Sequence, residues 1–214
     1  MINVHKFVFS PFAENTYILS DKTRECIIID PGCYEQHEKD KLADYIEKEN
    51  LKPVRLLNTH SHLDHVFGNK FVCDKYNLLP ELHKDELSGL QAVPTYSATM
   101  GLTVEPSPLP EKYLSEKDTI EFGDSRMSIL FTPGHSIASI SFYSEVDKIL
   151  IGGDVLFQGS IGRTDLPGGS YPTLIESILN EFLPLGDEVV VYSGHGPETT
   201  IGRERLSNPF LVNV

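Results

Sequence analysis

Three histidines and an aspartate crowd into one short segment of this sequence. His60, His62, Asp64 and His65 form the pattern HxHxDH two residues after the segment PVRLL, which reads as a short buried strand. Neutral imidazoles and carboxylates supply the nitrogen and oxygen donors that borderline divalent metals bind. Chance would place these residue types at these offsets in fewer than about one sequence in a thousand of this composition. The segment therefore predicts a metal site rather than a solvated polar loop.

Three further donors follow other apolar runs. His135, Asp154 and His195 close the segments SILFTPGH, KILIGGD and VVVYSGH. In layered α/β folds, loops at the carboxyl ends of strands gather ligand-binding groups. Together the two sets give seven donor side chains, which exceeds what one tetrahedral ion needs and suits two ions sharing a bridging carboxylate and a bridging water. Because no thiolate is among them, zinc, iron and manganese are all compatible with the set.

The elements that must position these donors can be predicted from hydrophobic periodicity and turn residues. Strands are expected over residues 4–9, 16–20, 25–30, 53–58, 118–122, 127–131, 138–143, 148–151 and 188–192. Helices are expected over 34–50, 66–76 and 171–183, whereas 86–110, with four prolines, reads as an irregular surface connection or flap. This order predicts an α/β fold of two similar β-then-α halves whose sheets pack together with helices outside.

Charge and composition exclude several classes of function. The 214 residues carry 18 basic and 31 acidic side chains, a net charge of −13, so a nucleic-acid partner is not expected. No apolar run is long enough for a membrane span, and the first residues read as a strand rather than a signal peptide. Cys26, Cys33 and Cys73 are scattered and odd in number, which favours a reducing, cytoplasmic location.

The chemistry-bearing residues resemble those of the metallo-β-lactamase superfamily. The likeness runs from NTYIL and DPG near the start to the tail of the chain. Within the superfamily, GGDVLFQGSIGRTDLPGG and SGHGPETTIGRERLSNPFL are similar to the glyoxalase II group, the hydroxyacylglutathione hydrolases, and most of all to its short bacterial branch. The resemblance implies a four-layered αββα sandwich, two β-sheets flanked by helices, as a single domain over residues 1–214.

The resemblance also assigns roles to the donors. It implies a first metal bound by His60, His62 and His135, a second bound by Asp64, His65 and His195, and Asp154 bridging the two. The ions would be two divalent metals, with zinc expected and iron or manganese possible.

The activity implied by the resemblance is hydrolysis of a small-molecule acyl thioester such as S-lactoylglutathione by a metal-bridging hydroxide. Two cations lower the pKa of a shared water toward neutrality, and Asp64 would orient the hydroxide besides binding metal. Glyoxalase II enzymes continue into a helical domain that helps to bind glutathione, and this sequence stops about where that domain would begin. The thiol half of the substrate, the acyl group and the oligomeric state are therefore left open.

Two residues next to the donors have alternative interpretations. Asp30 could accept a hydrogen bond from a ligand imidazole and fix its orientation, or it could belong to an ordinary Asp-Pro-Gly turn. Arg163 stands where the glyoxalase II pattern places a basic residue facing the substrate carboxylate, or it could pair with Asp165 at the surface.

Thioester hydrolysis has three alternatives, of which two are other activities and one is a role without catalysis. Persulfide dioxygenation at a single iron is the nearest, because that sister group resembles the GRTD segment, although SGHGPETT is more similar to the hydrolase branch. β-Lactam hydrolysis is disfavoured because Asp154 stands where the common zinc β-lactamases have a cysteine ligand. A non-catalytic metal-binding module is disfavoured because all seven donors are present.

Overall fold

A computed structural model describes residues 1–212 and divides them into two compact units. The first unit holds Met1–Leu114 and Glu121–Arg126, and the second holds Ser115–Ile120 and the residues from Met127 onward. Four of the seven donors lie in the first unit and three in the second. No helix in the described residues is long and apolar enough to cross a membrane.

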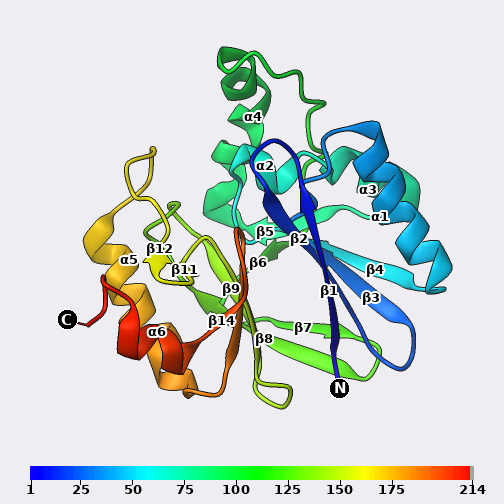
Figure 1. The fold of residues 1–214 in the computed structure, drawn as a ribbon. Coiled ribbons are helices and arrows are strands. Elements are labelled where there is room, and N and C mark those ends of the chain that lie inside the picture. The colour runs from blue at the N-terminus through cyan, green and yellow to red at the C-terminus, as the bar shows by residue number, and fades with distance from the viewer. Residues whose placement is uncertain (213–214) are drawn as a thin grey trace. The chain divides into compact units, whose positions relative to one another are not determined.

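The sheet of the first unit is mixed (Figure 1). Its first three strands form an antiparallel meander, and the strands from β3 onward pair in parallel. Ile27, Ile28 and Ile29 are fully buried, as expected for a strand covered on both faces. In spatial order the strands are β1 (Asn3–Phe9), β2 (Glu14–Ser20), β3 (Glu25–Ile29), β4 (Lys52–Leu57), β5 (Pro80–His83) and β6 (Tyr113–Leu114).

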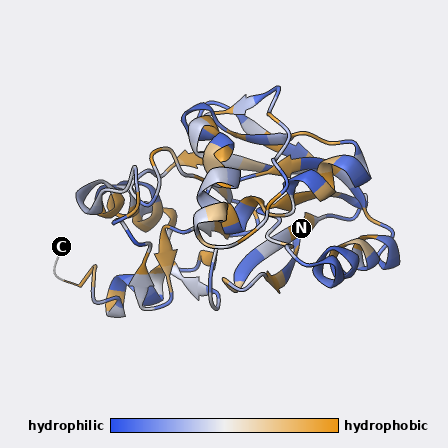
Figure 2. Ribbon diagram, turned by 90° about the horizontal axis from the view of Figure 1, so that it is seen from above, coloured by the Kyte–Doolittle hydropathy of each residue, from blue (hydrophilic) through white to orange (hydrophobic). Residues whose placement is uncertain are grey.

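Two helices of the first unit cover one face of this sheet. Helix α1 (Gln36–Lys48) buries Leu42 and Ile46, and helix α3 (Asn69–Tyr76) buries Val72 and Cys73 in the same apolar cluster as residues of β3 and β4. A capping box stabilises the amino end of α1, where the negative charge of Glu38 also interacts favourably with the helix dipole. Apolar residues concentrate in the strands, and hydrophilic residues mark the outward surfaces of the helices (Figure 2).

The prediction of an irregular segment over residues 86–110 is wrong for its first half. Helix α4 (Leu87–Thr99) follows a short 3₁₀ turn, η1 (Lys84–Glu86), and contains Pro94 in its interior. A proline there removes one backbone hydrogen bond, which made the helix hard to predict. The buried side chains of Leu90 and Val93, packed with the short helix α2 (Leu63–Val66), outweigh that loss. Strands β5 and β6 were also not predicted, because each is short.

The sheet of the second unit is also mixed, and only β10 and β13 pair in parallel among its described pairings. A separate hairpin joins β11 (Leu156–Phe157) to β12 (Ser160–Ile161) within the segment GGDVLFQGSIGRTDLPGG. In spatial order the strands of the sheet are β14 (Thr199–Thr200), β13 (Val190–Ser193), β10 (Ile149–Gly153), β9 (Ile140–Ser144), β8 (Ser125–Phe131) and β7 (Thr119–Phe122).

The predicted helix over 171–183 is present with a change of geometry. Helix α5 (Tyr171–Ser177) begins at Ser170, whose side chain accepts from the Thr173 amide. The chain then widens into a π turn, η2 (Ile178–Phe182), and ends in a 3₁₀ turn, η3 (Leu183–Leu185). A further helix, α6 (Ile201–Ser207), was not predicted, although Thr200 caps it through the Arg203 amide and carried a sequence signal for a helix start.

Candidate metal centre

The HxHxDH segment runs from the loop after β4 into helix α2, which contains Asp64 and His65, and is almost entirely buried. His60 and His65 have no exposed surface, Asp64 is 8% exposed, and only His62 is partly open. The His60 ring lies 4.7 Å from the His62 ring and 4.2 Å from the His65 ring, between centroids. Burying imidazoles and a carboxylate together is costly unless they are hydrogen-bonded or bind metal. The loop thus gathers its four donors in one buried cluster.

Asp30 holds this loop from the end of β3. Its Oδ1 accepts from the Thr59 amide at 2.7 Å, and its Oδ2 accepts from the Thr59 hydroxyl at 2.6 Å. The same Oδ2 lies 3.1 Å from Nδ1 of His65. A hydrogen bond there fixes the ring and leaves Nε2 as the donor to a metal. Asp30 has a φ of +49°, a left-handed conformation that Asp and Asn tolerate better than other side chains.

A second buried carboxylate, that of Glu14, lies near the same His65 nitrogen that Asp30 contacts. Its Oε2 accepts from the Thr16 hydroxyl at 2.9 Å, and its Oε1 lies 4.0 Å from Nδ1 of His65. Burial raises the pKa of Glu14 well above its usual value, and the nearby His65 opposes that shift. A Cβ at Gly32 would come within 2.0 Å of Glu14 Oε2, so this position needs glycine. Glu14 carries no sequence signal for a place beside the histidine loop, because it is the first residue of strand β2.

In the second unit, the two histidine donors both face one oxygen atom of the third donor, Asp154. Oδ2 of Asp154 lies 3.5 Å from Nε2 of His135 and 3.5 Å from Nε2 of His195. Two ligands at about 2.0–2.1 Å from one tetrahedral ion lie about 3.3 Å apart, so the spacing fits ligands of a shared metal site better than direct hydrogen bonds. A carboxylate oxygen equidistant from two imidazoles is the arrangement that a bridging ligand requires.

The other nitrogen of His135 is held by the main chain. Its Nδ1 lies 2.8 Å from the carbonyl oxygen of Arg163, and a hydrogen bond there selects the tautomer with Nε2 available. Gly162, the residue before Arg163, packs closely against the main chain of Asp154, because a Cβ at that position would lie 1.9 Å from the Asp154 carbonyl oxygen.

Gly162→Ala is therefore expected to lower the free energy of unfolding by about 1–3 kcal/mol, because the new methyl group must displace the backbone of Asp154 or Arg163. Urea unfolding of the metal-free protein measures this loss. Gly159→Ala is the matched control, since a Cβ there meets nothing within 4 Å and only its φ of +69° is strained. Equal losses in the two variants would contradict the steric explanation.

Helix α6 secures the loops that carry two of these donors. Glu204 is fully buried; its Oε2 accepts from the Gly159 amide at 2.8 Å and its Oε1 accepts from the Thr199 hydroxyl at 2.5 Å. Asn208 donates to the Ser160 carbonyl at 3.0 Å. One carboxylate thus ties the β11–β12 hairpin, which leads to Arg163, to the segment that follows His195. These residues were within a recognised motif, but their contacts were not predictable from it.

Arg163 forms an ion pair with Asp165, which is the second of the two interpretations that its sequence position allowed. Its Nε donates to Oδ1 of Asp165 at 2.7 Å, and a second guanidinium nitrogen donates to Oδ2 at 2.8 Å. The two side chains are 61% and 69% exposed, and the pairing lowers the pKa of Asp165 to about 2. A pair this exposed contributes little to stability, so the guanidinium is available for exchange with another carboxylate.

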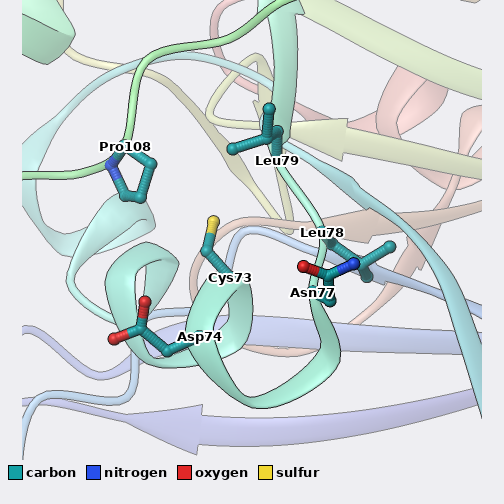
Figure 3. Close-up of a pocket in the computed structure, with 6 residues that line it drawn as sticks. All are labelled: Cys73, Asp74, Asn77, Leu78, Leu79 and Pro108. Carbon is teal, nitrogen blue, oxygen red and sulfur yellow. The ribbon is translucent and has the colours of Figure 1, made fainter.

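Neither the cysteines nor a cavity at the end of α3 belongs to the predicted donor set. Cys26, Cys33 and Cys73 are free and buried, and burial raises the pKa of each thiol to about 12, so none is suited to nucleophilic catalysis. A cavity of about 670 Å³ in the first unit is lined by Cys73, Asp74 and neighbouring residues from the end of α3, with Pro108 opposite (Figure 3). None of the predicted metal donors lines it.

The sequence over residues 10–195 matches the family model of the metallo-beta-lactamase superfamily. The chain belongs to this superfamily. The match spans all seven donors and both compact units.

Relatives within the superfamily cover nearly the whole chain. A probable metallo-hydrolase, YqgX of Bacillus subtilis, is 39% identical over 94% of this chain and 93% of its own length. The hydroxyacylglutathione hydrolase GloC of Haemophilus influenzae is 35% identical over 98% of both chains.

Solved structures of superfamily members superpose closely. The BLEG-1 B3 metallo-beta-lactamase is 37% identical, with a TM-score of 0.89 and 99% of both chains covered. The protein TTHA1623, solved in a di-iron-bound form, is 35% identical, with a TM-score of 0.87 over 97% of this chain and 100% of that one. The predicted metallo-β-lactamase fold, with two mixed sheets flanked by helices, is thereby confirmed.

Proposed function

We propose that this member of a metallo-hydrolase superfamily hydrolyses small-molecule acyl thioesters such as S-lactoylglutathione, and that both units act together as one domain. The observation that carries the proposal is the donor set around Asp154, whose Oδ2 lies 3.5 Å from one nitrogen each of His135 and His195. Two imidazoles facing one carboxylate oxygen, without a thiolate, suit a hydrolytic metal pair. The relative GloC, named a hydroxyacylglutathione hydrolase, supports the choice of substrate.

The proposed ligands are the seven donors of the HxHxDH loop and of the three later loops. His60, His62 and His135 would hold one divalent ion, Asp64, His65 and His195 a second, and Asp154 would be shared. Nitrogen and oxygen donors accept zinc, iron or manganese, and the di-iron form of TTHA1623 supports iron as strongly as the chemistry supports zinc. When bound, such ions polarise a carbonyl and lower the pKa of a water molecule.

The chain's own residues would orient this chemistry. Asp64, 8% exposed, would accept a hydrogen bond from the attacking water and direct its lone pair toward the carbonyl carbon. Asp30 and the Arg163 carbonyl hold His65 and His135 in the tautomers that present Nε2. A thiolate leaves readily, so the reaction needs no strong general acid.

The cellular setting follows from the thiols. Because Cys26, Cys33 and Cys73 are all free, we place the protein in the reducing cytoplasm. A glutathione-type thioester is an anion available in that compartment.

Substrate assays on protein loaded with two equivalents of zinc, iron or manganese test the proposal. Thioester cleavage, followed by release of thiol, is expected with S-lactoylglutathione. A chromogenic β-lactam is the comparison substrate, because the BLEG-1 enzyme is named a β-lactamase. If the thioester stays intact while the β-lactam is hydrolysed rapidly, the protein is a β-lactamase and the proposal is wrong. If the protein with one iron per chain takes up oxygen in the presence of a persulfide, persulfide dioxygenation is the activity instead.

The exchange of partners at Arg163 gives a separate prediction. Arg163→Ala is expected to raise KM about tenfold for a thioester with a free carboxylate and to leave KM unchanged for its methyl ester, because one charge-assisted bidentate contact is lost. Asp165→Ala, which frees the guanidinium, is expected to lower KM for the carboxylated substrate. If both variants change KM in the same direction, Arg163 and Asp165 form only a surface ion pair.

A further inference from the structure

A buried carboxylate outside the seven donors contacts the middle of the histidine loop. Glu86 is 2% exposed and lies where η1 meets α4. Its Oε2 accepts from the Ser61 amide at 2.9 Å and from the Ser61 hydroxyl at 2.5 Å. Ser61 is the residue between His60 and His62, so one carboxylate oxygen holds the main chain that carries both imidazoles.

The first turn of α4 is shaped to bring this carboxylate to the loop. Gly89, three residues after Glu86, faces the same serine, and a Cβ there would lie 2.3 Å from Ser61 Oγ. A side chain at this position would have to displace the Ser61 hydroxyl that donates to Glu86. Glycine in the first turn of α4 therefore leaves room for the contact between Ser61 and Glu86.

Apolar contacts fix the remainder of the helix against the same loop. Leu90 and Val93 of α4 pack in one buried cluster with Leu63, Val66 and Phe67, which follow His62 directly or closely. The loop is thus held by two hydrogen bonds at its centre and by apolar packing after its second histidine. In the absence of these contacts, a loop carrying several imidazoles would have more backbone freedom to lose on binding metal.

We infer that Glu86 is a positioning residue for the metal centre, acting through Ser61 to hold the main chain of His60 and His62 in the conformation that binds metal. The inference rests on the proposed ligand role of these histidines. The inference gives helix α4 a role in supporting the metal centre, whereas an irregular surface connection or flap was predicted for this segment.

Cobalt(II) titration of chelator-stripped protein tests the inference without any substrate. Visible absorption reports the binding, elemental analysis reports the number of ions, and circular dichroism reports folding. Glu86→Ala is expected to weaken cobalt(II) binding about tenfold, the low end for residues that support metal ligands, because Glu86 acts through a neighbour. Glu86→Gln, whose amide oxygen can accept the same two hydrogen bonds, is expected to stay within about threefold of wild type.

Two further variants keep the test sharp. Asp118 provides the matched control, because its Oδ2 accepts from the amide and hydroxyl of Ser115 at 2.9 Å each, and Ser115 neighbours no predicted ligand. Asp118→Ala should leave cobalt(II) binding unchanged. Ser61→Ala combined with Glu86→Ala should weaken binding by less than the sum of the two single changes, because each of them removes the hydrogen bond from the Ser61 hydroxyl to Glu86.

The possible results separate the inference from the proposed function. Wild-type affinity in a folded Glu86→Ala variant, or an equal loss in Asp118→Ala, would overturn the role of Glu86. If Glu86→Ala does not fold, the double variant of Glu86→Gln and Ser61→Ala is measured in its place. Additive losses of cobalt(II) affinity from these two changes would then overturn the role of Glu86. Wild-type cobalt(II) binding by His60→Ala would show that the ligand assignment itself is wrong, whatever Glu86 does.

Discussion

Replacement of Asp154 by Asn is expected to lower kcat/KM for a thioester at least about a thousandfold, which corresponds to about 4 kcal/mol of transition-state stabilisation. The metal content should fall from two ions per chain to one or fewer. The reason is that Oδ2 of Asp154 is the atom that His135 and His195 both face at 3.5 Å. An amide keeps the shape but loses the negative charge that two cations would share.

Stability measurements distinguish this loss from misfolding. The metal-free variant should unfold within about 1 kcal/mol of wild type, because the substitution preserves volume and removes a buried charge. Asp147→Asn is the control and should retain full activity, since Asp147 accepts from the Ser144 hydroxyl in a turn and is not a predicted donor. Two tightly bound ions in Asp154→Asn would show that this carboxylate does not bridge them.

Replacement of Asp30 by Ala is expected to lower the free energy of unfolding by about 3 kcal/mol or more. Three buried donors lose their acceptor, namely the amide and hydroxyl of Thr59 and Nδ1 of His65. Alanine also fits the left-handed backbone at this position poorly. Asp30→Asn should lose less stability, because asparagine tolerates that backbone and keeps one oxygen that can accept a hydrogen bond.

The same change should weaken metal binding about 10- to 100-fold, because the His65 ring loses the acceptor that orients it. Asp21 supplies the control for general destabilisation. Its carboxylate accepts four hydrogen bonds, from the backbone and side chain of Thr23, the Asp124 amide and the Ser125 hydroxyl, in a turn of the first unit. Asp21→Asn should lower stability without altering metal affinity, and equal metal loss in both variants would remove the special role of Asp30.

The strands that carry the donors were predictable because their sequences are locally consistent. Continuous apolar runs such as Ile149–Ile151, which precedes Asp154, leave few alternatives to a buried strand. Helix α4 was not predictable in the same way, because Pro94 argues locally against a helix while Leu90 and Val93 find their partners only in α2 and its neighbours. Short strands such as β6 depend on a neighbouring strand for every hydrogen bond, so they have almost no local signal.

Residue types and their spacing predict the chemistry of this protein without its fold. The seven donors, each found shortly after an apolar run, predict a metal site and point to the superfamily that the family model confirms, because ligand chemistry depends on residue type and survives changes elsewhere in the fold. The other residues that hold the donors become evident in the folded chain alone. Glu86, Glu14 and Glu204 are buried carboxylates whose partners lie 25, about 50 and 45 residues away along the chain. Such contacts have no sequence period, since they exist only after distant segments have packed and left each buried donor in need of an acceptor.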